Sequence, residues 1–109
     1  MPNLLDIENV TTLDEALKAP RGILYKHSTR CPVSTYAFEE IRSFANSHPA
    51  WTIYVLKVIE QRPLSDEVVA QLAIPHQSPQ VFVIRNGRCT WNASHADINE
   101  RELDKQTTG

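Results

Sequence analysis

The 109-residue chain has little cysteine, little glycine and no large excess of charge of either sign. Its two cysteines cannot build the disulfide framework of a small secreted domain. Its three glycines form no phosphate-binding loop. The four histidines and two cysteines do not show metal-ligand spacing, so we expect no bound metal. The net charge of −2, with both signs interspersed, argues against a nucleic-acid partner.

Targeting signals and membrane spans are also missing from the sequence. Residues 1–8 do not combine a charged region with an apolar one, and the chain has no long apolar run. We therefore expect a soluble, cytoplasmic protein without membrane contact. The length predicts a single domain over residues 1–109.

The hydrophobic pattern predicts an α/β domain in which helices and strands alternate. Thr12 and Glu15 have the spacing of a capping box, Ser65 is expected to cap a later helix, and Asn86-Gly87 predicts a β-hairpin. A right-handed crossover followed by that hairpin gives a four-stranded mixed sheet with helices on both faces. The expected helices are 12–18, 32–46, 65–74 and 94–105, and the expected strands are 22–28, 51–59, 78–85 and 88–92.

Cys31 is the most informative residue, because it lies where a strand leads into a helix. Pro32 suits the first helical position, so Cys31 would face unpaired N–H groups and the positive end of the helix dipole. Arg30 adds a neighbouring cation. These surroundings favour the thiolate, which is the nucleophile in disulfide chemistry. We predict a moderately lowered pKa for Cys31, since a very low pKa also weakens nucleophilicity.

Ser34 bears on the type of chemistry that Cys31 can perform. Dithiol oxidoreductases place a second cysteine three residues after the first, where one helical turn brings the two sulfurs together. A hydroxyl at this position cannot resolve a mixed disulfide, so the cycle needs a thiol from outside. Ser34 could hydrogen-bond the Cys31 thiolate or simply solvate the first turn of the helix, and the sequence leaves both interpretations open.

Two further residues are candidates for the same chemistry. Cys89 follows the predicted hairpin turn, and strand alternation places it on the same face as Trp91. We expect Cys89 to be far from Cys31 and to serve as a buried structural thiol rather than a disulfide partner. His27 precedes Cys31 by four residues and could act as a base, but a packing role at the strand end is the stronger hypothesis.

The order of elements, with Cys31-Pro32 at the first strand-to-helix turn and an X-Pro before the third strand, resembles the thioredoxin fold. A narrower resemblance is to the monothiol bacilliredoxin family, and it extends from about residue 12 to residue 105. Arg30 replaces the threonine usual in that family, and Val33 replaces an isoleucine. Four segments carry the resemblance: residues 26–34, 62–65, 76–80 and 91–95.

The resemblance implies an activity. Bacilliredoxins remove bacillithiol, a small thiol, from mixed disulfides on other proteins. Cys31 would attack the mixed disulfide, release the thiol of the S-thiolated client protein and keep the small thiol until another thiol removes it. Bacillithiol would thus be a co-substrate, and no bound cofactor is implied.

The resemblance also implies the residues around the nucleophile. Pro79 would form a cis peptide bond facing Cys31, so that the backbone of Ser78 is offered to an extended substrate. Ser94 and His95 would open the last helix beside the same groove, where free N–H groups and Arg30 could bind a carboxylate of the small thiol. The same positions have plainer interpretations: an N-cap serine, an exposed histidine and a proline that starts a strand.

Thioredoxins carry a buried carboxylate six residues before the nucleophile, and Tyr25 occupies this position here. This substitution argues against an acid–base relay of the thioredoxin kind. The segment 62–65 has no evident physical role beyond a turn and a helix cap.

Alternative functions remain open at the level of the sequence. The chain could be a thioredoxin-fold adaptor that binds a partner without turnover, or a sensor whose Cys31 is oxidised by peroxide to a sulfenic acid. Use of glutathione in place of bacillithiol is a variant of the main hypothesis.

Overall fold

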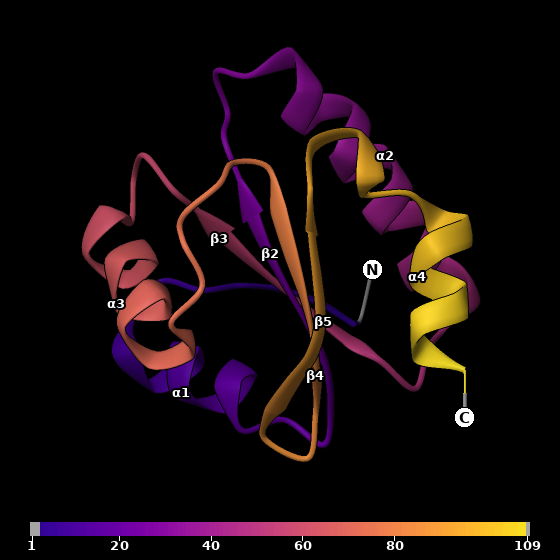
Figure 1. The fold of residues 1–109 in the computed structure, drawn as a ribbon, viewed down its shortest axis with the longest axis horizontal. Helices are drawn as coiled ribbons and strands as arrows, with labels where there is room; N and C mark the ends of the chain where they lie inside the picture. Colours follow the sequence, from indigo (N-terminus) through magenta and orange to yellow (C-terminus); the bar gives the residue numbers. More distant parts are fainter. Residues whose placement is uncertain (1–2, 109) are drawn as a thin grey trace.

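A computed structural model describes residues 3–108 and shows a central sheet between two layers of helices (Figure 1). The sheet has five strands in the order β1-β3-β2-β4-β5. The strands are β1 (Leu4–Asp6), β2 (Arg21–His27), β3 (Thr52–Lys57), β4 (Gln80–Arg85) and β5 (Arg88–Ser94). The helices are α1 (Val10–Leu17), α2 (Pro32–Ser47), α3 (Arg62–Leu72), the short 3-10 helix η1 (His95–Asp97) and α4 (Glu100–Thr107).

The predicted α/β class, with a mixed sheet and helices on both faces, is confirmed. Strands β1, β3 and β2 run parallel, whereas β4 and β5 are antiparallel to their neighbours. The predicted number of four strands is wrong, because β1 adds a fifth at the edge. This strand has only three residues, Leu4–Asp6, which is too short for an alternating pattern to be recognised.

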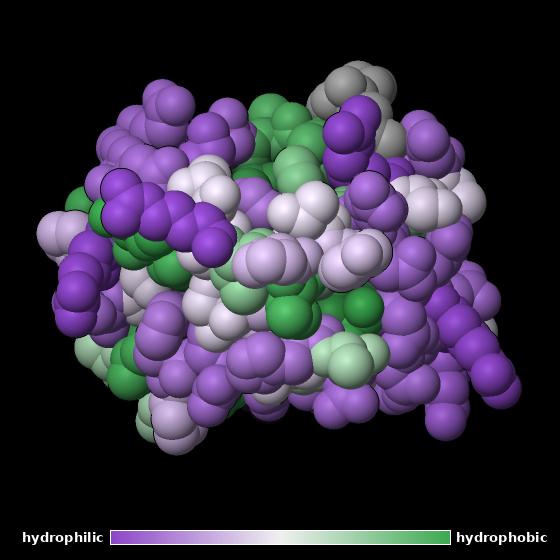
Figure 2. Space-filling model, turned by 90° about the horizontal axis from the view of Figure 1, so that it is seen from above, coloured by the Kyte–Doolittle hydropathy of each residue, from purple (hydrophilic) through white to green (hydrophobic). Residues whose placement is uncertain are grey.

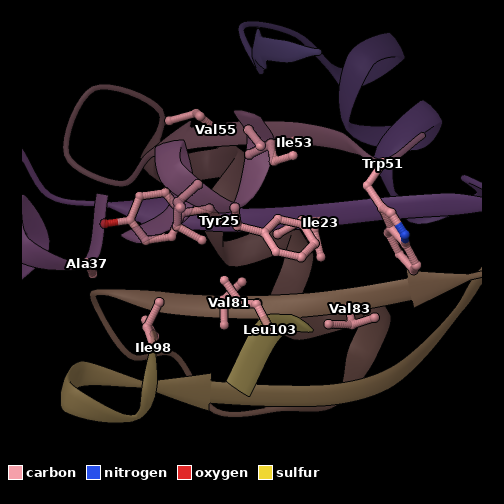
Figure 3. Close-up of a cluster of buried hydrophobic side chains, with 13 residues drawn as sticks. Ile23, Tyr25, Ala37, Trp51, Ile53, Val55, Val81, Val83, Ile98 and Leu103 are labelled. Atoms are coloured by element: carbon pink, nitrogen blue, oxygen red, sulfur yellow. The ribbon is translucent and has the colours of Figure 1, made fainter. Parts of the chain in front are cut away.

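Each face of the sheet carries its own apolar core, since successive side chains along a strand point to opposite faces. On one face, Ile23 and Tyr25 of β2 pack with buried residues of α2 and α4 (Figure 3). On the other face, Leu24 of β2 packs with buried residues of α1 and α3. Alternation therefore places Lys26 on the α1/α3 face, whereas Cys31 begins the helix that covers the opposite face.

Two of the predicted helix starts are wrong. Asn9, not Thr12, caps α1: its Oδ1 accepts a hydrogen bond of 2.9 Å from the backbone N–H of Thr12. Helix α3 begins at Arg62, so that Ser65 lies buried inside the helix rather than capping it. Asn9 before α1 and Pro63 in the first turn of α3 are equally good signals of a helix start, and they precede Thr12 and Ser65 in the sequence.

The last helix also begins later than predicted. Ser94 ends β5, and the following three residues form the short helix η1. Helix α4 starts at Glu100 and is capped by Asn99, whose Oδ1 accepts from the N–H of Glu102 at 2.8 Å. Between the two helices, extended backbone at Ile98 places its side chain in the core, which interrupts the helix predicted from residue 94.

A bulge in the hairpin reverses one predicted orientation. Trp91 is opposite Val83 and Cys89 is opposite Ile84, so Thr90 is an extra residue between neighbouring pairs. As a result, Trp91 packs on the α2/α4 face and Cys89 packs on the α1/α3 face. The prediction that both share one face is wrong, because simple alternation fails across a bulge.

Across residues 3–108, the helices are too short or too polar for any of them to cross a lipid bilayer.

Candidate active site

The turn between β2 and α2 is held by hydrogen bonds that arise within the turn itself. The Oγ atom of Ser34 accepts from the backbone N–H of Ser28 at 3.2 Å. The N–H of Cys31 in turn donates to the carbonyl oxygen of Ser28 at 3.3 Å. Ser34 is fully buried, so the interpretation that it solvates the first turn is wrong. Its hydroxyl instead fixes the turn that presents Cys31.

Cys31 is the N-cap residue of α2, and Pro32 takes the first helical position as predicted. The thiol makes no capping hydrogen bond, and its side chain is partly exposed. The backbone N–H of Ser34 lowers the pKa of Cys31, partial burial opposes this, and the N–H of Val33 and the Ser34 hydroxyl lower it further. These N–H groups belong to the first turn of α2, where helical partners are missing. The pKa of Cys31 therefore shifts in the predicted direction, towards the thiolate.

Tyr25 and His27 support the turn from below. The phenol of Tyr25 donates to the carbonyl oxygen of Ser34 at 2.9 Å. Because this bond uses its only proton, the contact of 3.1 Å with Nδ1 of His27 has the histidine as donor. Burial raises the pKa of Tyr25 far above its usual value, so the side chain stays neutral. No carboxylate relay can operate through this residue.

His27 is engaged in packing as well as in that hydrogen bond. Its ring lies 4.8 Å from the ring of Phe38, centroid to centroid. Burial and the nearby Lys57 lower the pKa of His27, which keeps the imidazole neutral. These contacts favour the packing role over the role of a base.

Three segments that are distant in the sequence meet at one end of the sheet, beyond the last residue of β2. Lys26 of β2 pairs with Gln80 of β4, and Gln80 pairs with Ser94 of β5. The Ser78–Pro79 peptide bond is cis, as predicted, and it immediately precedes Gln80. The carbonyl oxygen of Pro79 accepts from the N–H of His95 at 3.2 Å. The predicted site residues therefore lie at this end of the sheet: Arg30, Cys31, Pro32, Ser34, Ser78, Pro79, Ser94 and His95.

The start of the last helix differs from the one on which the anion site was predicted. The N–H of His95 is already bonded to Pro79. The true start of α4 is occupied too, because the N–H of Glu100 donates to a carboxylate oxygen of Glu40 at 3.1 Å. Ser94 and His95 remain beside Pro79, and their role in binding an anion stays a prediction. Arg30 is exposed next to Cys31.

A recess of about 500 Å³ opens beside the thiol, and its lining includes Arg30, Tyr36 and Glu39. Tyr36 is 72% exposed and Val33 is 41% exposed, which is unusual for large apolar side chains. Figure 2 looks onto this end of the molecule and shows pale and green side chains in the middle of a purple rim. An apolar area with a polar rim is typical of a surface that receives another molecule. Cys31 itself lines the recess together with Tyr36.

A polar cluster on the other face of the sheet was not foreseen from the sequence. Lys26 is completely buried, and its Nζ donates to the carbonyl oxygen of Ser65 at 3.2 Å. The same Nζ lies 3.0 Å from Nδ1 of His76. Burial lowers the pKa of Lys26 to about 8, and Asp66 partly offsets this. A lysine at an inward position of an apolar strand was the available signal.

Cys89 lies at the other end of the β2–β4 pair. It is opposite Ile84, which pairs with Gly22 at the start of β2, whereas Cys31 follows the end of that strand. Both cysteines are free. The thiol of Cys89 donates to the carbonyl oxygen of Trp91 at 3.5 Å, and burial raises its pKa. These features support the prediction of a structural thiol.

Within residues 3–108, no three histidine, cysteine, aspartate or glutamate side chains are placed so that they could hold a metal ion.

Comparison with solved structures identifies the fold. One protein with a thioredoxin fold, described provisionally as an oxidoreductase, is 27% identical and superposes with a TM-score of 0.89, covering 96% of this chain and 94% of that one. Thioredoxin from Trypanosoma brucei brucei is 13% identical with a TM-score of 0.76, covering 96% and 88% of the two chains. Mitochondrial thioredoxin 3 from Saccharomyces cerevisiae is 12% identical with a TM-score of 0.74, covering 97% and 94%.

The two thioredoxins establish the thioredoxin fold, and the first protein agrees with an oxidoreductase built on it. The family follows from the sequence comparison, which matches nearly the whole chain. Residues 3–103 match the family described as monothiol bacilliredoxin BrxC, and the chain belongs to this family.

Proposed function

We propose that this thiol oxidoreductase is a monothiol disulfide reductase, which uses Cys31 to remove a low-molecular-weight thiol from mixed disulfides on client proteins. The observation that carries the proposal is the position of Cys31 at the N-cap of α2, with the N–H groups of Val33 and Ser34 lowering its pKa. Ser34 stands where a dithiol enzyme has its second sulfur. A reducing compartment such as the cytoplasm would keep Cys31 free for this cycle.

The reaction consists of two thiol–disulfide exchanges. In the first, the Cys31 thiolate attacks the sulfur of the small thiol, the mixed disulfide breaks, and the client leaves as a thiolate that takes up a proton. Cys31 then carries the small thiol in a disulfide. In the second exchange, the thiolate of another small thiol attacks the adduct. The two small thiols leave together as a symmetric disulfide, and the Cys31 thiolate is restored.

The groups at the same end of the sheet as Cys31 would hold the substrate. The backbone of Ser78, before the cis bond to Pro79, offers an N–H and a carbonyl oxygen to an extended client segment. Ser94 and His95 border this position, and Pro32 borders the thiol. Arg30 provides an exposed cation for a carboxylate of the small thiol. The family name favours bacillithiol over glutathione as the small thiol. Bacillithiol carries carboxylates that Arg30 could bind.

A reporter experiment tests this proposal. A client protein with one cysteine is loaded in turn with bacillithiol, glutathione or free cysteine, and is incubated with the wild type and with the Cys89→Ser variant. Mass spectrometry then records the loss of the small thiol from the reporter and its mass on Cys31. We expect the bacillithiol adduct to form fastest, and equally in both proteins.

Other results would contradict the proposal. If no adduct forms and the Cys31→Ser variant binds the loaded reporter as tightly as the wild type, the chain is an adaptor. If peroxide converts Cys31 to an oxidised form faster than any mixed disulfide transfers its thiol, the chain is a sensor. A fastest reaction with glutathione would change the co-substrate but not the chemistry.

A further inference from the structure

Two buried polar side chains lie under the loop that leads to Ser78 and Pro79. Lys26 of β2 and Gln80 of β4 are register partners in the sheet, and their exposed fractions are 0% and 2%. Both side chains reach the segment 75–77, which connects α3 to the cis peptide bond. A buried polar group is costly unless it is hydrogen-bonded, so each side chain restrains the partners that satisfy it.

Lys26 connects three elements. From β2 its Nζ donates to the carbonyl oxygen of Ser65 in α3, at 3.2 Å, and contacts Nδ1 of His76 in the loop, at 3.0 Å. An ammonium group can only donate, so Nδ1 of His76 accepts and this imidazole is neutral. Burial and the positive charge of Lys26 both lower the pKa of His76, in agreement with a neutral ring. The remaining charged groups near the pair are Asp66 and Arg62, both of α3.

Gln80 secures the same loop through its amide. Its Nε2 donates to the carbonyl oxygen of Pro75 at 3.1 Å, and its Oε1 accepts from the N–H of Gln77 at 3.0 Å. The loop is therefore bonded at three successive residues, Pro75, His76 and Gln77. The next residue is Ser78, whose backbone precedes the cis bond.

We propose that Lys26 is a positioning residue: through His76 and together with Gln80 it holds the loop that presents the Ser78 backbone to the substrate. The effect on turnover rests on the proposed function, whereas the effect on the loop does not. The proposal gives a physical role to segments 62–65 and 76–80, since Ser65 and His76 are the two partners of Lys26. The described hydrogen bonds of Lys26 do not include Cys31, so the thiol should keep its own reactivity.

The first test separates substrate binding from the reactivity of the thiol. Lys26→Met keeps a long side chain but removes the donor. We expect KM for the loaded client protein to rise about tenfold, in keeping with the loss of a hydrogen bond to a charged group, while kcat changes little. The alkylation rate of Cys31 should stay at the wild-type value. Val68→Ala is the matched control, because Val68 is buried on the same face but its side chain cannot form a hydrogen bond to the loop.

Variants of His76 identify the bond that matters. His76→Leu removes the acceptor and should raise KM like Lys26→Met, whereas His76→Asn keeps an acceptor oxygen and should restore much of the affinity. The double variant Lys26→Met/His76→Leu should be affected less than the sum of the two single variants, because both changes remove the same contact between Nζ and Nδ1. A rise in KM for Val68→Ala equal to that for Lys26→Met, or full additivity in the double variant, would overturn the proposal.

Hydrogen exchange tests whether Lys26 holds the loop at residues 75–77, and this measurement does not depend on enzymatic turnover. In Lys26→Met, the amide of Gln77, which donates to Oε1 of Gln80 in the wild type, should exchange about tenfold faster, while the amides of α2 keep their rates. Val68→Ala should not produce this local change. If the wild type showed no removal of small thiols, the proposed function would fail and this measurement would still decide the role of Lys26. Unchanged exchange at Gln77 in Lys26→Met would refute it.

Discussion

Cys31 and Cys89 lie at opposite ends of the β2–β4 pair, and their surroundings act on the two thiols in opposite directions. Both are free and partly exposed. At Cys31, the N–H groups at the start of α2 outweigh partial burial and lower the pKa. At Cys89, burial outweighs the backbone contact with Trp91 and raises the pKa. The same side chain is thus shifted towards the thiolate at one end and towards the protonated thiol at the other.

The difference shows that partial exposure alone does not make a cysteine reactive. What distinguishes Cys31 is the orientation of backbone N–H groups, which depends on the helix that begins at Pro32 and on the turn fixed by Ser34. Cys89 lies in the edge strand β5 and not at a helix start, and its one backbone contact, with Trp91, does not offset the effect of burial on its pKa. The following experiments act on this contrast.

The largest effect is expected from removing each thiol in turn. Cys31→Ser should abolish removal of the small thiol from a loaded client, because a hydroxyl is not a nucleophile for disulfides at neutral pH. Cys89→Ser should retain the wild-type rate. The measurement is release of the small thiol, followed by mass spectrometry. Residual turnover in Cys31→Ser that disappears in the double variant would show that Cys89 also reacts, and the contrast between the thiols would fail.

The next change gives Cys31 a neighbour that it lacks. Ser34→Cys places a thiol one helical turn further on, within the Cα separation that a disulfide requires. Loaded with the small thiol, this variant should expel it and form an internal disulfide, whereas the wild-type adduct persists. Mass spectrometry distinguishes the adduct from a loss of two hydrogens.

Ser34→Ala is the control for the Ser34→Cys variant, since it loses the bond to Ser28 but gains no thiol. Its adduct should persist as in the wild type. A stable adduct in Ser34→Cys would mean that the turn holds the two positions apart, and the absence of a second sulfur would then not explain the single-thiol chemistry.

The pH dependence of alkylation measures the contrast directly. A lowered pKa gives a larger thiolate fraction at neutral pH, so Cys31 should react faster than Cys89 at pH 7, by about tenfold or more. The midpoint of the rate against pH should lie below that of a free cysteine for Cys31 and above it for Cys89. Cys89→Ser and Cys31→Ser each leave one thiol, which allows separate measurements. Coinciding midpoints would contradict the opposite pKa shifts.

Local signals in the sequence were sufficient to predict the turn that places Cys31 at the start of a helix. Cys31 before Pro32 marks a helix start by the rules of capping, and the cis bond at Pro79 followed from the thioredoxin resemblance. The mixed sheet with two helical layers was also predictable, because its strands and most helices are strongly patterned.

The errors arise where tertiary contacts override local signals. The bulge at Thr90 moved Cys89 to the other face, and the burial of Ile98 interrupted the last predicted helix. The cluster around Lys26 joins residues up to 50 positions apart, so local periodicity and spacing could not show it. In the sequence, Lys26 stood out only as a lysine in an apolar strand, and its partners lay in the segments 62–65 and 76–80 of the resemblance.

The smallest expected effect concerns stability, and it has opposite signs at the two cysteines. Cys31 occupies an N-cap without making a capping bond, and its extended backbone suits a serine there. At an acid pH, where both thiols are protonated and the thiolate adds no stability, Cys31→Ser should therefore raise the free energy of unfolding through a bond from an N–H of the first turn to the new hydroxyl. Cys89→Ser should lower it by about 1 kcal/mol, since a more polar group enters the partly buried site against the α1/α3 core.

Urea denaturation with an unchanged m-value measures both changes. If Cys31→Ser destabilised the fold as much as Cys89→Ser, Cys31 would contribute to packing. The presence of a cysteine at this N-cap would then be explained by stability and not by a reaction. A stabilised but inactive Cys31→Ser variant would show that this N-cap keeps a cysteine at the expense of a better cap. That result would separate the residue required for the reaction from the residue required for the fold.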